Sequence, residues 1–341
     1  MKRSPTMEKD YSDKNDLIVE NVALIGYGYW GKKIYKYLQE SNHFNLNHVY
    51  FPSLERIKRS SPNIDFGKEF VSSINQIWED KGTPHVIIAT PINTHFQLAH
   101  EALLSSKNVL VEKPLSTTLK EAILLKNIAS KRKLNLITEY TYTFSNGLLY
   151  AKSLIDEDVI GSIKSISITI KQLGRFLDYD VYTLLGTHAL SILDIFIPLN
   201  ECMFTAQPLL LNDKIVTGGL ISFKDKASDC SGYIDVTLHC PEREKKVIIY
   251  GERGTIIYNP NSDKTLKVIL YNSGSKDLQE ELVSEQNDHR FDENHNLRNA
   301  IIAFWEIVSK QKEDNIERAV AITAVLESLY INPGQHSFTP K

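Results

Sequence analysis

The hydrophobic pattern of the first 140 residues alternates between two periods. Short runs rich in β-branched residues occur as NVALIGYG, NLNHVYF, PHVIIATP, KNVLVEKP and LNLITEY. Between them lie segments such as GKKIYKYLQES and THFQLAHEALLSS, whose apolar residues recur every three or four positions. Strands that alternate with helices through short connections are typical of a parallel sheet covered by helices. The pattern therefore predicts a parallel α/β domain over residues 19–140.

After residue 141 the period changes to two. A helix is expected near residues 145–160, and SIKSISITIKQLG then alternates apolar and polar residues, as do ISFK, SGYIDVTLHC, KKVIIYG, GTIIYN and KVILYN. These runs predict an open, mainly antiparallel sheet of about six strands. Two helical patterns, NLRNAIIAFWEIVSK and ERAVAITAVLESLY, follow them. We expect an α+β domain for substrate binding and oligomerisation over residues 141–341, with C-terminal helices able to pack back on the first domain.

Composition and charge narrow the classes of partner. The chain has 341 residues, 42% hydrophobic and 24% charged, which suits an ordinary globular protein of two domains. A net charge of -3 offers no basic face for nucleic acid or an anionic membrane. Residues 1–18 contain charged residues where a signal peptide would be apolar, so we expect a disordered leader. No apolar run approaches the length of a membrane span. We therefore expect neither nucleic acid nor a membrane as a partner.

The cysteines indicate a reducing compartment. Cys202, Cys230 and Cys240 are odd in number and lack the CxxC spacing. Neither a disulfide framework nor a zinc site is predicted from them. We therefore expect a cytoplasmic protein without a bound metal.

A glycine-rich turn links the first predicted strand to the first predicted helix. Gly26, Gly28 and Gly31 have the spacing G-x-G-x-x-G directly after the strand. The first glycine permits a tight turn, the second lets a pyrophosphate approach the backbone, and the third lets the helix close on the strand. The N–H groups of the first helical turn, which includes Tyr29 and Trp30, then face the phosphates. The motif predicts a Rossmann domain that binds NAD or NADP, the alternative being a glycine-punctuated turn of another α/β protein.

The end of the second predicted strand carries no carboxylate. An acidic residue about 20 positions after the glycine turn usually binds the adenosine ribose of NAD. Phe51 occupies this position, and Ser53 and Arg56 follow it, with Lys58 and Arg59 behind them. These donors suit a 2′-phosphate better than a bare ribose, which favours NADP slightly. Alternatively, the basic residues form the solvated face of a short helix.

Two further strand ends, in IIATPINTH and NVLVEKP, carry residues expected on the cofactor side. They are Thr90, Pro91, Asn93, His95, Glu112 and Lys113. Because the carboxyl ends of parallel strands line the ligand crevice, we expect Lys113 to project towards the nicotinamide. Taken alone, a Glu-Lys-Pro tripeptide is also typical of a surface turn.

In their order along the chain, these motifs resemble those of the glucose–fructose oxidoreductase, inositol dehydrogenase and rhizopine catabolism family (Gfo/Idh/MocA). The resemblance runs from about Asn21 to Tyr330. It rests on GYGYWG, ATPINTH, EKP, DEDVIGSIKSISI, GTHALSILD, GERGTIIYN and LRNAIIAFWEIV. Each segment is weak alone, and their shared order makes a chance match improbable. The LG before the histidine-containing helix and ALSILDIF after the histidine are most similar to the sugar-nucleotide 3-dehydrogenase branch.

The resemblance implies roles for individual residues. Lys113 matches the lysine that contacts the reacting substrate hydroxyl, and His188 matches the histidine that takes or gives the hydroxyl proton. Residues that match cofactor-side positions are Thr90, Pro91, Asn93, His95 and Glu112. Candidate substrate contacts in and near the second domain are Tyr140, Tyr142, Arg175 and Tyr182. The alternative for His188 is a core histidine bonded to a backbone carbonyl.

The chain departs from the family pattern at Leu184. Four residues before the histidine, members often carry an aspartate, whose carboxylate would orient the imidazole and raise its basicity. Leu184 can do neither. Nearby Asp178, Asp180 and Tyr182 are the residues that could substitute.

The function implied by the resemblance is hydride transfer between NAD or NADP and the hydroxyl or ketone carbon of a sugar or sugar nucleotide. The open sheet face is expected to build a homodimer or homotetramer. Two alternatives stay open, because a fold does not decide function. One is a reductase of a non-sugar small molecule, and the other is a catalytically silent NAD(P)-binding regulator. Leu184 favours the silent protein, whereas Lys113 and His188 oppose it.

Overall fold

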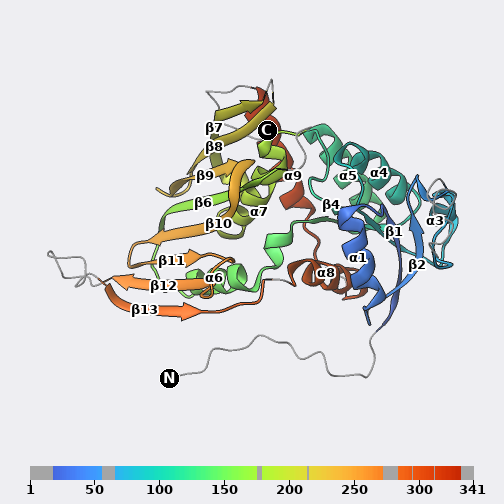
Figure 1. Ribbon diagram of the computed structural model, residues 1–341, viewed down its shortest axis with the longest axis horizontal. Helices are drawn as coiled ribbons and strands as arrows, with labels where there is room; N and C mark the ends of the chain where they lie inside the picture. The colour runs from blue at the N-terminus through green and yellow to red at the C-terminus, as the bar shows by residue number, and fades with distance from the viewer. Residues whose placement is uncertain are drawn as a thin grey trace.

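Two β-sheets of different kinds organise the chain. The computed structural model describes residues 18–55, 66–174, 179–212, 215–271, 283–293, 295–310 and 312–331. Within these ranges one sheet has five strands and the other eight, and helices lie between them (Figure 1). All but the last residue of the expected leader, residues 1–18, fall outside the described ranges.

The first sheet is parallel throughout, in the order β2-β1-β3-β4-β5. Its strands are β1 (Glu20–Ile25), β2 (Phe44–Tyr50), β3 (His85–Ile88), β4 (Asn108–Glu112) and β5 (Leu136–Glu139). The helices that follow them are α1 (Tyr29–Gln39), α3 (Asn75–Glu79), α4 (His95–Leu104) and α5 (Leu119–Arg132), with a 3₁₀ turn η1 (Ile92–Thr94) before α4. The predicted Rossmann-type α/β domain is confirmed.

Alternate residues of these strands point to opposite faces of the sheet, and each face is covered. Leu24, Leu110 and Ile137 belong to one buried cluster that includes Phe304 and Trp305 of α8 (Asn296–Lys310). The neighbouring strand residues belong to the larger cluster shared with α4 and α5. A C-terminal helix therefore completes the core of the first sheet.

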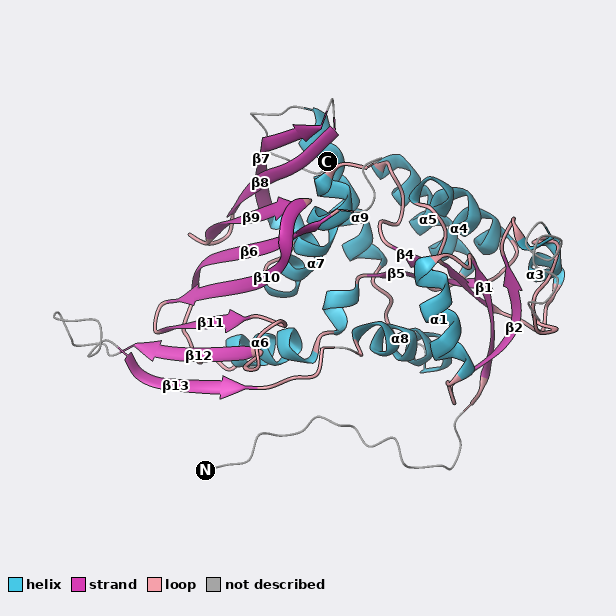
Figure 2. Cartoon of the chain, viewed as in Figure 1, coloured by secondary structure: helices cyan, strands magenta, loops and turns pink. Residues whose placement is uncertain are grey.

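The second sheet is mainly antiparallel, in the order β13-β12-β11-β10-β6-β9-β8-β7, with only the β6–β9 pair parallel (Figure 2). Its strands are β6 (Ile163–Leu173), β7 (Cys202–Asn212), β8 (Ile215–Asp225), β9 (Ser231–Thr237), β10 (His239–Gly251), β11 (Gly254–Tyr258), β12 (Leu266–Tyr271) and β13 (Val283–His289). The expected strand number of about six was therefore too low. The two edge strands were missed because β7 contains Pro208 and ends in exposed leucines, and β13 is almost wholly polar.

Helices cover the face of this sheet that looks towards the first domain (Figure 1). They are α6 (Asn146–Asp156), α7 (Thr187–Phe196) and α9 (Ile316–Ile331), with short helical turns η2 (Thr141–Phe144), η3 (Tyr182–Gly186, a π-helical turn) and η4 (Leu199–Glu201). The predicted helix near 145–160 is thus α6. In the described part of the chain, none of the helices combines the length and apolar character that crossing a membrane requires.

The edge strand β5 is held by the start of α9. The Thr138 amide donates to Asn315 Oδ1 at 2.8 Å, and Asn315 Nδ2 donates to the Thr138 carbonyl at 2.8 Å. Side-chain partners of this kind satisfy the free backbone groups of an edge strand. The end of β5 is therefore fixed between the two sheets.

Candidate functional site

The glycine turn has the geometry of a pyrophosphate cradle. Gly26 has a φ of +104°, and a Cβ there would lie 2.2 Å from the Ala89 carbonyl oxygen. A Cβ on Gly31 would lie 2.2 Å from the Gly26 carbonyl oxygen. An added Cβ on Gly28 would meet no atom within 4 Å. The first and third glycines are thus required for packing, and the second faces open space at the start of α1.

A cavity of about 700 Å³ opens directly against this turn. Its lining residues are Gly26, Tyr27, Gly28, Lys32, Tyr35, Phe51, Pro52, Ser53, Phe66, Gly67, Phe70, Ala89, Thr90 and Pro91. Tyr27 stacks on Phe51, with 5.5 Å between ring centroids. The first-turn amides of α1 have no side-chain cap, and such amides suit phosphate oxygens. Size, aromatic wall and amide donors fit a dinucleotide.

The predicted cofactor residues divide into three groups. Gly26, Gly28, Ser53, Thr90 and Pro91 line the cavity. Residues near the cavity that do not line it are Tyr29, Trp30 and Asn93, which are exposed, and Gly31, His95 and Glu112, which are buried. Arg56, Lys58 and Arg59 lie outside the described residues.

His95 joins the ends of β3 and β4. Its Nδ1 lies 2.8 Å from the Pro114 carbonyl oxygen and its Nε2 lies 2.9 Å from the Thr90 carbonyl oxygen. The side chain is 1% exposed, so burial lowers the pKa of the ring. His95 thus links the turns that follow β3 and β4, and it does not line the cavity.

Lys113 reaches from the end of β4 to the second domain. Its Nζ donates to the carbonyl oxygen of Leu184 in η3 at 2.8 Å. Burial lowers the Lys113 pKa to about 8, while the charges of Glu112 and Glu139 oppose this shift. Because π-helical turns are frequent at functional sites, the contact makes the junction of the two domains a candidate site.

Two carboxyl groups stand beside Lys113. Glu112 and Glu139 are register partners in β4 and β5, so their side chains point to the same face of the sheet. Burial raises the Glu112 pKa to about 7, and burial together with the Glu112 charge raises the Glu139 pKa well above its usual range. Thr141 Oγ1 donates to Glu139 Oε2 at 2.9 Å, and Glu139 Oε1 is buried without a partner. Since two buried carboxylates ionise together only at high cost, the pair retains a proton at neutral pH.

His188 lies in the first turn of α7, next to the Tyr142 ring. The two rings meet edge to face with centroids 5.2 Å apart. Burial, followed by the charges of Lys113 and Lys245, lowers the His188 pKa well below its usual value. His188 Nδ1 is buried and has no hydrogen-bond partner. Burial and the two nearby cations therefore favour the neutral form of the imidazole.

Of the residues considered as substitutes for the family's aspartate, the two that the structure describes, Asp180 and Tyr182, make no hydrogen bond to His188 Nδ1. Asp180 accepts from the Thr183 amide at 2.9 Å and from Thr183 Oγ1 at 2.8 Å, so its carboxylate caps its own turn. Leu184 packs against the core, and Asp178 lies outside the described residues.

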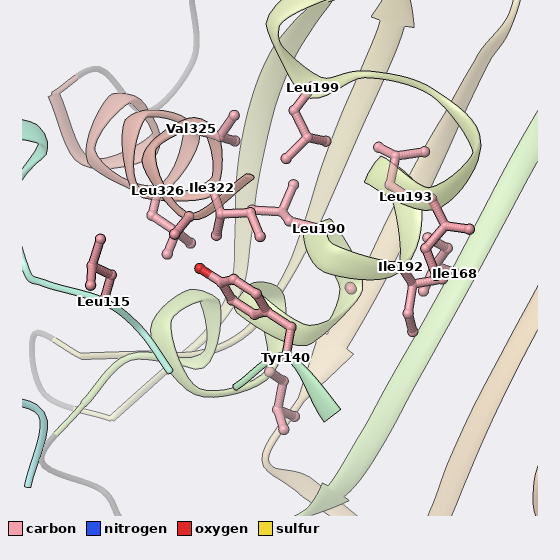
Figure 3. Close-up of a cluster of buried hydrophobic side chains, with 14 of the residues drawn as sticks. Leu115, Tyr140, Ile168, Leu190, Ile192, Leu193, Leu199, Ile322, Val325 and Leu326 are labelled. Atoms are coloured by element: carbon pink, nitrogen blue, oxygen red, sulfur yellow. The ribbon is translucent and has the colours of Figure 1, made fainter. Parts of the chain in front are cut away.

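Two of the predicted substrate contacts are corrected by the structure. Tyr140 is completely buried among Leu115, Leu190 and Ile322, as Figure 3 shows. Tyr182 is 2% exposed and packs against β8, where a Cβ on Gly219 would lie 2.3 Å from its hydroxyl oxygen. Helix α9 covers the Tyr140 ring and strand β8 covers the Tyr182 ring, so both side chains fill core positions. Tyr142 remains at the site, and Arg175 lies outside the described residues.

Sequence reasoning missed Glu139 and Lys245. Glu139 stands at the end of a strand, as Glu112 does, so the same criterion would have found it. Lys245 lies in a run of charged residues, EREKK, that is typical of a solvent-exposed segment, so the sequence offered no reason to expect it at a site. Within the described residues, no group of three or more His, Cys, Asp or Glu side chains could hold a metal ion.

Comparisons with known proteins identify the fold of the first domain. Residues 20–140 match the family model described as an oxidoreductase family with an NAD-binding Rossmann fold, GFO_IDH_MocA. The NADP-dependent scyllo-inositol 2-dehydrogenase of Bacillus subtilis is 26% identical over 147 residues, 43% of this chain and 39% of that protein. Such matches span 37% to 39% of the length of four curated relatives.

Solved structures resemble more than nine-tenths of the chain, as two of them illustrate. A 3-ketoreductase variant from Actinomadura kijaniata, in complex with TDP-benzene and NADP, has a TM-score of 0.76 at 18% identity, over 92% of this chain and 98% of that one. GenD2 from gentamicin A biosynthesis, in complex with NAD, has a TM-score of 0.76 at 17% identity, over 93% and 95%. At such low identity the likeness shows that the two-domain fold is shared.

Proposed function

We propose that this chain is an NAD(P)-dependent dehydrogenase or ketoreductase of a sugar or sugar nucleotide. The match of residues 20–140 to the Gfo/Idh/MocA family model supports this proposal. The observation that carries the proposal is the meeting of Lys113, from the end of β4, with the turn that leads into His188. A relative named as an inositol dehydrogenase and a fold neighbour named as a 3-ketoreductase support a polyhydroxyl substrate.

The mechanism requires two groups at one hydroxyl. The Lys113 ammonium would donate to the substrate oxygen and favour its developing negative charge. Neutral His188 would accept the hydroxyl proton during oxidation and return it during reduction. The bound nicotinamide supplies the hydride acceptor or donor. Gly28 and the first turn of α1 would hold the pyrophosphate, and the Glu112–Glu139 pair would keep the Lys113 charge balanced.

We expect the protein to bind NADP somewhat more tightly than NAD. Phe51 stands where a ribose-binding acid is usual, and Lys32 and Ser53 also line the cavity. The dissociation constants of NAD and NADP test this directly. A preference for NAD of about tenfold, or roughly 1.4 kcal/mol, would contradict it.

An activity assay separates this function from its rivals. Cofactor reduction is measured with a panel of sugars, sugar phosphates and nucleotide sugars, and cofactor oxidation with the matching ketones. Turnover of a member of the panel supports the proposal. Cofactor binding without turnover of any sugar or non-sugar carbonyl would favour the silent regulator, for which Leu184 is the supporting observation.

Oligomer formation through the uncovered face of the second sheet is part of the proposal. Tyr233 and Tyr250 on this face are 48% and 40% exposed. A homodimer or homotetramer would cover them, and light scattering gives the mass. The unpaired Cys202, Cys230 and Cys240 suit a cytoplasmic setting.

A further inference from the structure

Two basic side chains, His188 and Lys245, lie against the Tyr142 ring. The His188 ring meets it with centroids 5.2 Å apart, and Lys245 Nζ lies 4.9 Å from the same Tyr142 centroid. Lys245 belongs to β10, and its alternate neighbours Val247 and Ile249 are buried under the helices. By the period of a strand, Lys245 therefore points to the covered face, where the candidate site lies.

The charge of Lys245 is not balanced by an acid. In the part of the chain that the structure describes, Lys245 forms no ion pair, although neighbouring Lys171 is paired with Asp235 at 2.5 Å. Lys113, in contrast, stands beside Glu112 and Glu139. An aromatic face stabilises a cation without neutralising it.

The surroundings of His188 also lack the usual acid. Leu184 takes the place of the family's aspartate, and the Asp180 carboxylate is bonded to Thr183. The charges of both Lys113 and Lys245 reach the imidazole. Two cations thus act on the imidazole while Lys245 has no ion pair among the described residues, and a negative charge bound beside Lys245 would restore balance.

We propose that Lys245 is an anion-binding position that takes a carboxylate or phosphate substituent of the sugar bound at Lys113 and His188. The inference rests on the proposed function and narrows its substrate class to sugar acids, sugar phosphates or nucleotide sugars. The phosphates of the dinucleotide are a different anion, because the glycine turn that holds them lies in the first domain at the start of α1. Lys245 comes from the second domain.

The test measures binding, so that it does not depend on turnover. Full-length protein loaded with NADP is titrated calorimetrically with D-glucose, D-glucuronate and D-glucose 6-phosphate, and the His188 ring resonances are followed by NMR. Because a charge-assisted hydrogen bond is stronger than one between neutral groups, at least one acidic sugar is expected to bind about tenfold more tightly than glucose or better. The glucuronate and phosphate arms show which anion is preferred.

Two variants locate the effect. Lys245→Gln is expected to remove the preference for the acidic sugar, and Lys245→Arg to retain most of it. Lys246→Gln removes the same charge one residue away, on the opposite face of the strand, and should keep the preference. Equal binding of all three sugars, a preference that survives Lys245→Gln, or unchanged His188 resonances with every sugar would each overturn the inference. Turnover of a neutral sugar without any anion preference would overturn it while leaving the proposed function intact.

Discussion

The Lys113 ammonium donates a hydrogen bond to the Leu184 carbonyl oxygen, 71 residues away in sequence and 2.8 Å away in space. The contact places the family-matched lysine at the residue where the family usually carries an acid. A backbone carbonyl can hold the ammonium, but it bears no full charge and cannot orient the imidazole one turn later. Lys113 is therefore positioned at the turn that precedes His188, whose Nδ1 has no hydrogen-bond partner among the described residues.

The first prediction concerns Lys113 and His188 themselves. Lys113→Ala and His188→Ala should each lower the rate by roughly 10² to 10⁴, the usual range for groups that move or stabilise a proton. Because both serve one transition state, the double variant should lose much less than the product of the two losses. Cofactor affinity, measured by calorimetry, should be unchanged. A His188→Ala enzyme with full activity on its substrate would assign the proton to another group.

Leu184→Asp should raise the pKa of His188. A carboxylate one turn before the imidazole favours the charged form, and a more basic imidazole is a better proton acceptor. The pKa follows from the NMR titration of the His188 ring, and the rate should rise with it. Leu184→Asn is the matched control, because it is similar in size and uncharged. Equal His188 pKa values in the two variants would show that a charge at position 184 does not affect the His188 ring.

An added side chain should impair cofactor binding at Gly28 and folding stability at Gly31. Gly28 has a φ of -79°, which any residue adopts, and open space around its Cβ position. Gly28→Val should therefore fold normally and lose cofactor binding, because the side chain occupies the place of the pyrophosphate. Gly31→Ala should instead lower the free energy of unfolding, because its Cβ meets the Gly26 backbone. Calorimetry and urea unfolding measure the two effects; normal cofactor affinity in Gly28→Val would remove the turn from the site.

Glu139→Gln should flatten the dependence of stability on pH. A carboxyl whose pKa is raised on folding contributes stability below its unfolded pKa of about 4.3, and this contribution is lost as pH rises through the folded pKa. For Glu112 the folded value is about 7, and for Glu139 it is raised well above the usual range. Urea unfolding at pH 6 and pH 9 should give a smaller difference for the variant than for the parent. The exposed Glu252→Gln should leave the difference unchanged, and an unchanged difference in Glu139→Gln would refute the shared proton.

Tyr140→Phe should raise the free energy of unfolding. The Tyr140 hydroxyl is buried without a hydrogen-bond partner, and such a group costs roughly 1 kcal/mol or more. Tyr258→Phe is the control, since Ser145 Oγ donates to the Tyr258 hydroxyl at 3.1 Å and this bond would be lost. Chemical denaturation should thus move the two variants in opposite directions. Destabilisation of both would mean that Tyr140 has a polar partner after all.

Local chemistry along the chain determined the fold class and the position of the cofactor turn. Strand and helix periods, and the spacing of Gly26, Gly28 and Gly31, depend on residues that are neighbours in sequence, so they could be read without a structure. The same holds for Lys113, which follows its strand directly. The edge strands β7 and β13 lacked this periodicity because an edge strand buries little of either face.

Tertiary structure decided which of the candidate side chains meet. Tyr140, Tyr142 and Tyr182 look alike as sequence, yet α9 buries the first, β8 buries the third and only Tyr142 contacts His188. The pairing of Glu112 with Glu139 depends on strand register, and the approach of Lys245 to Tyr142 depends on the packing of a sheet against η2. Charge balance and burial at the site arise from segments far apart in the chain, and sequence spacing carries no information about such distances.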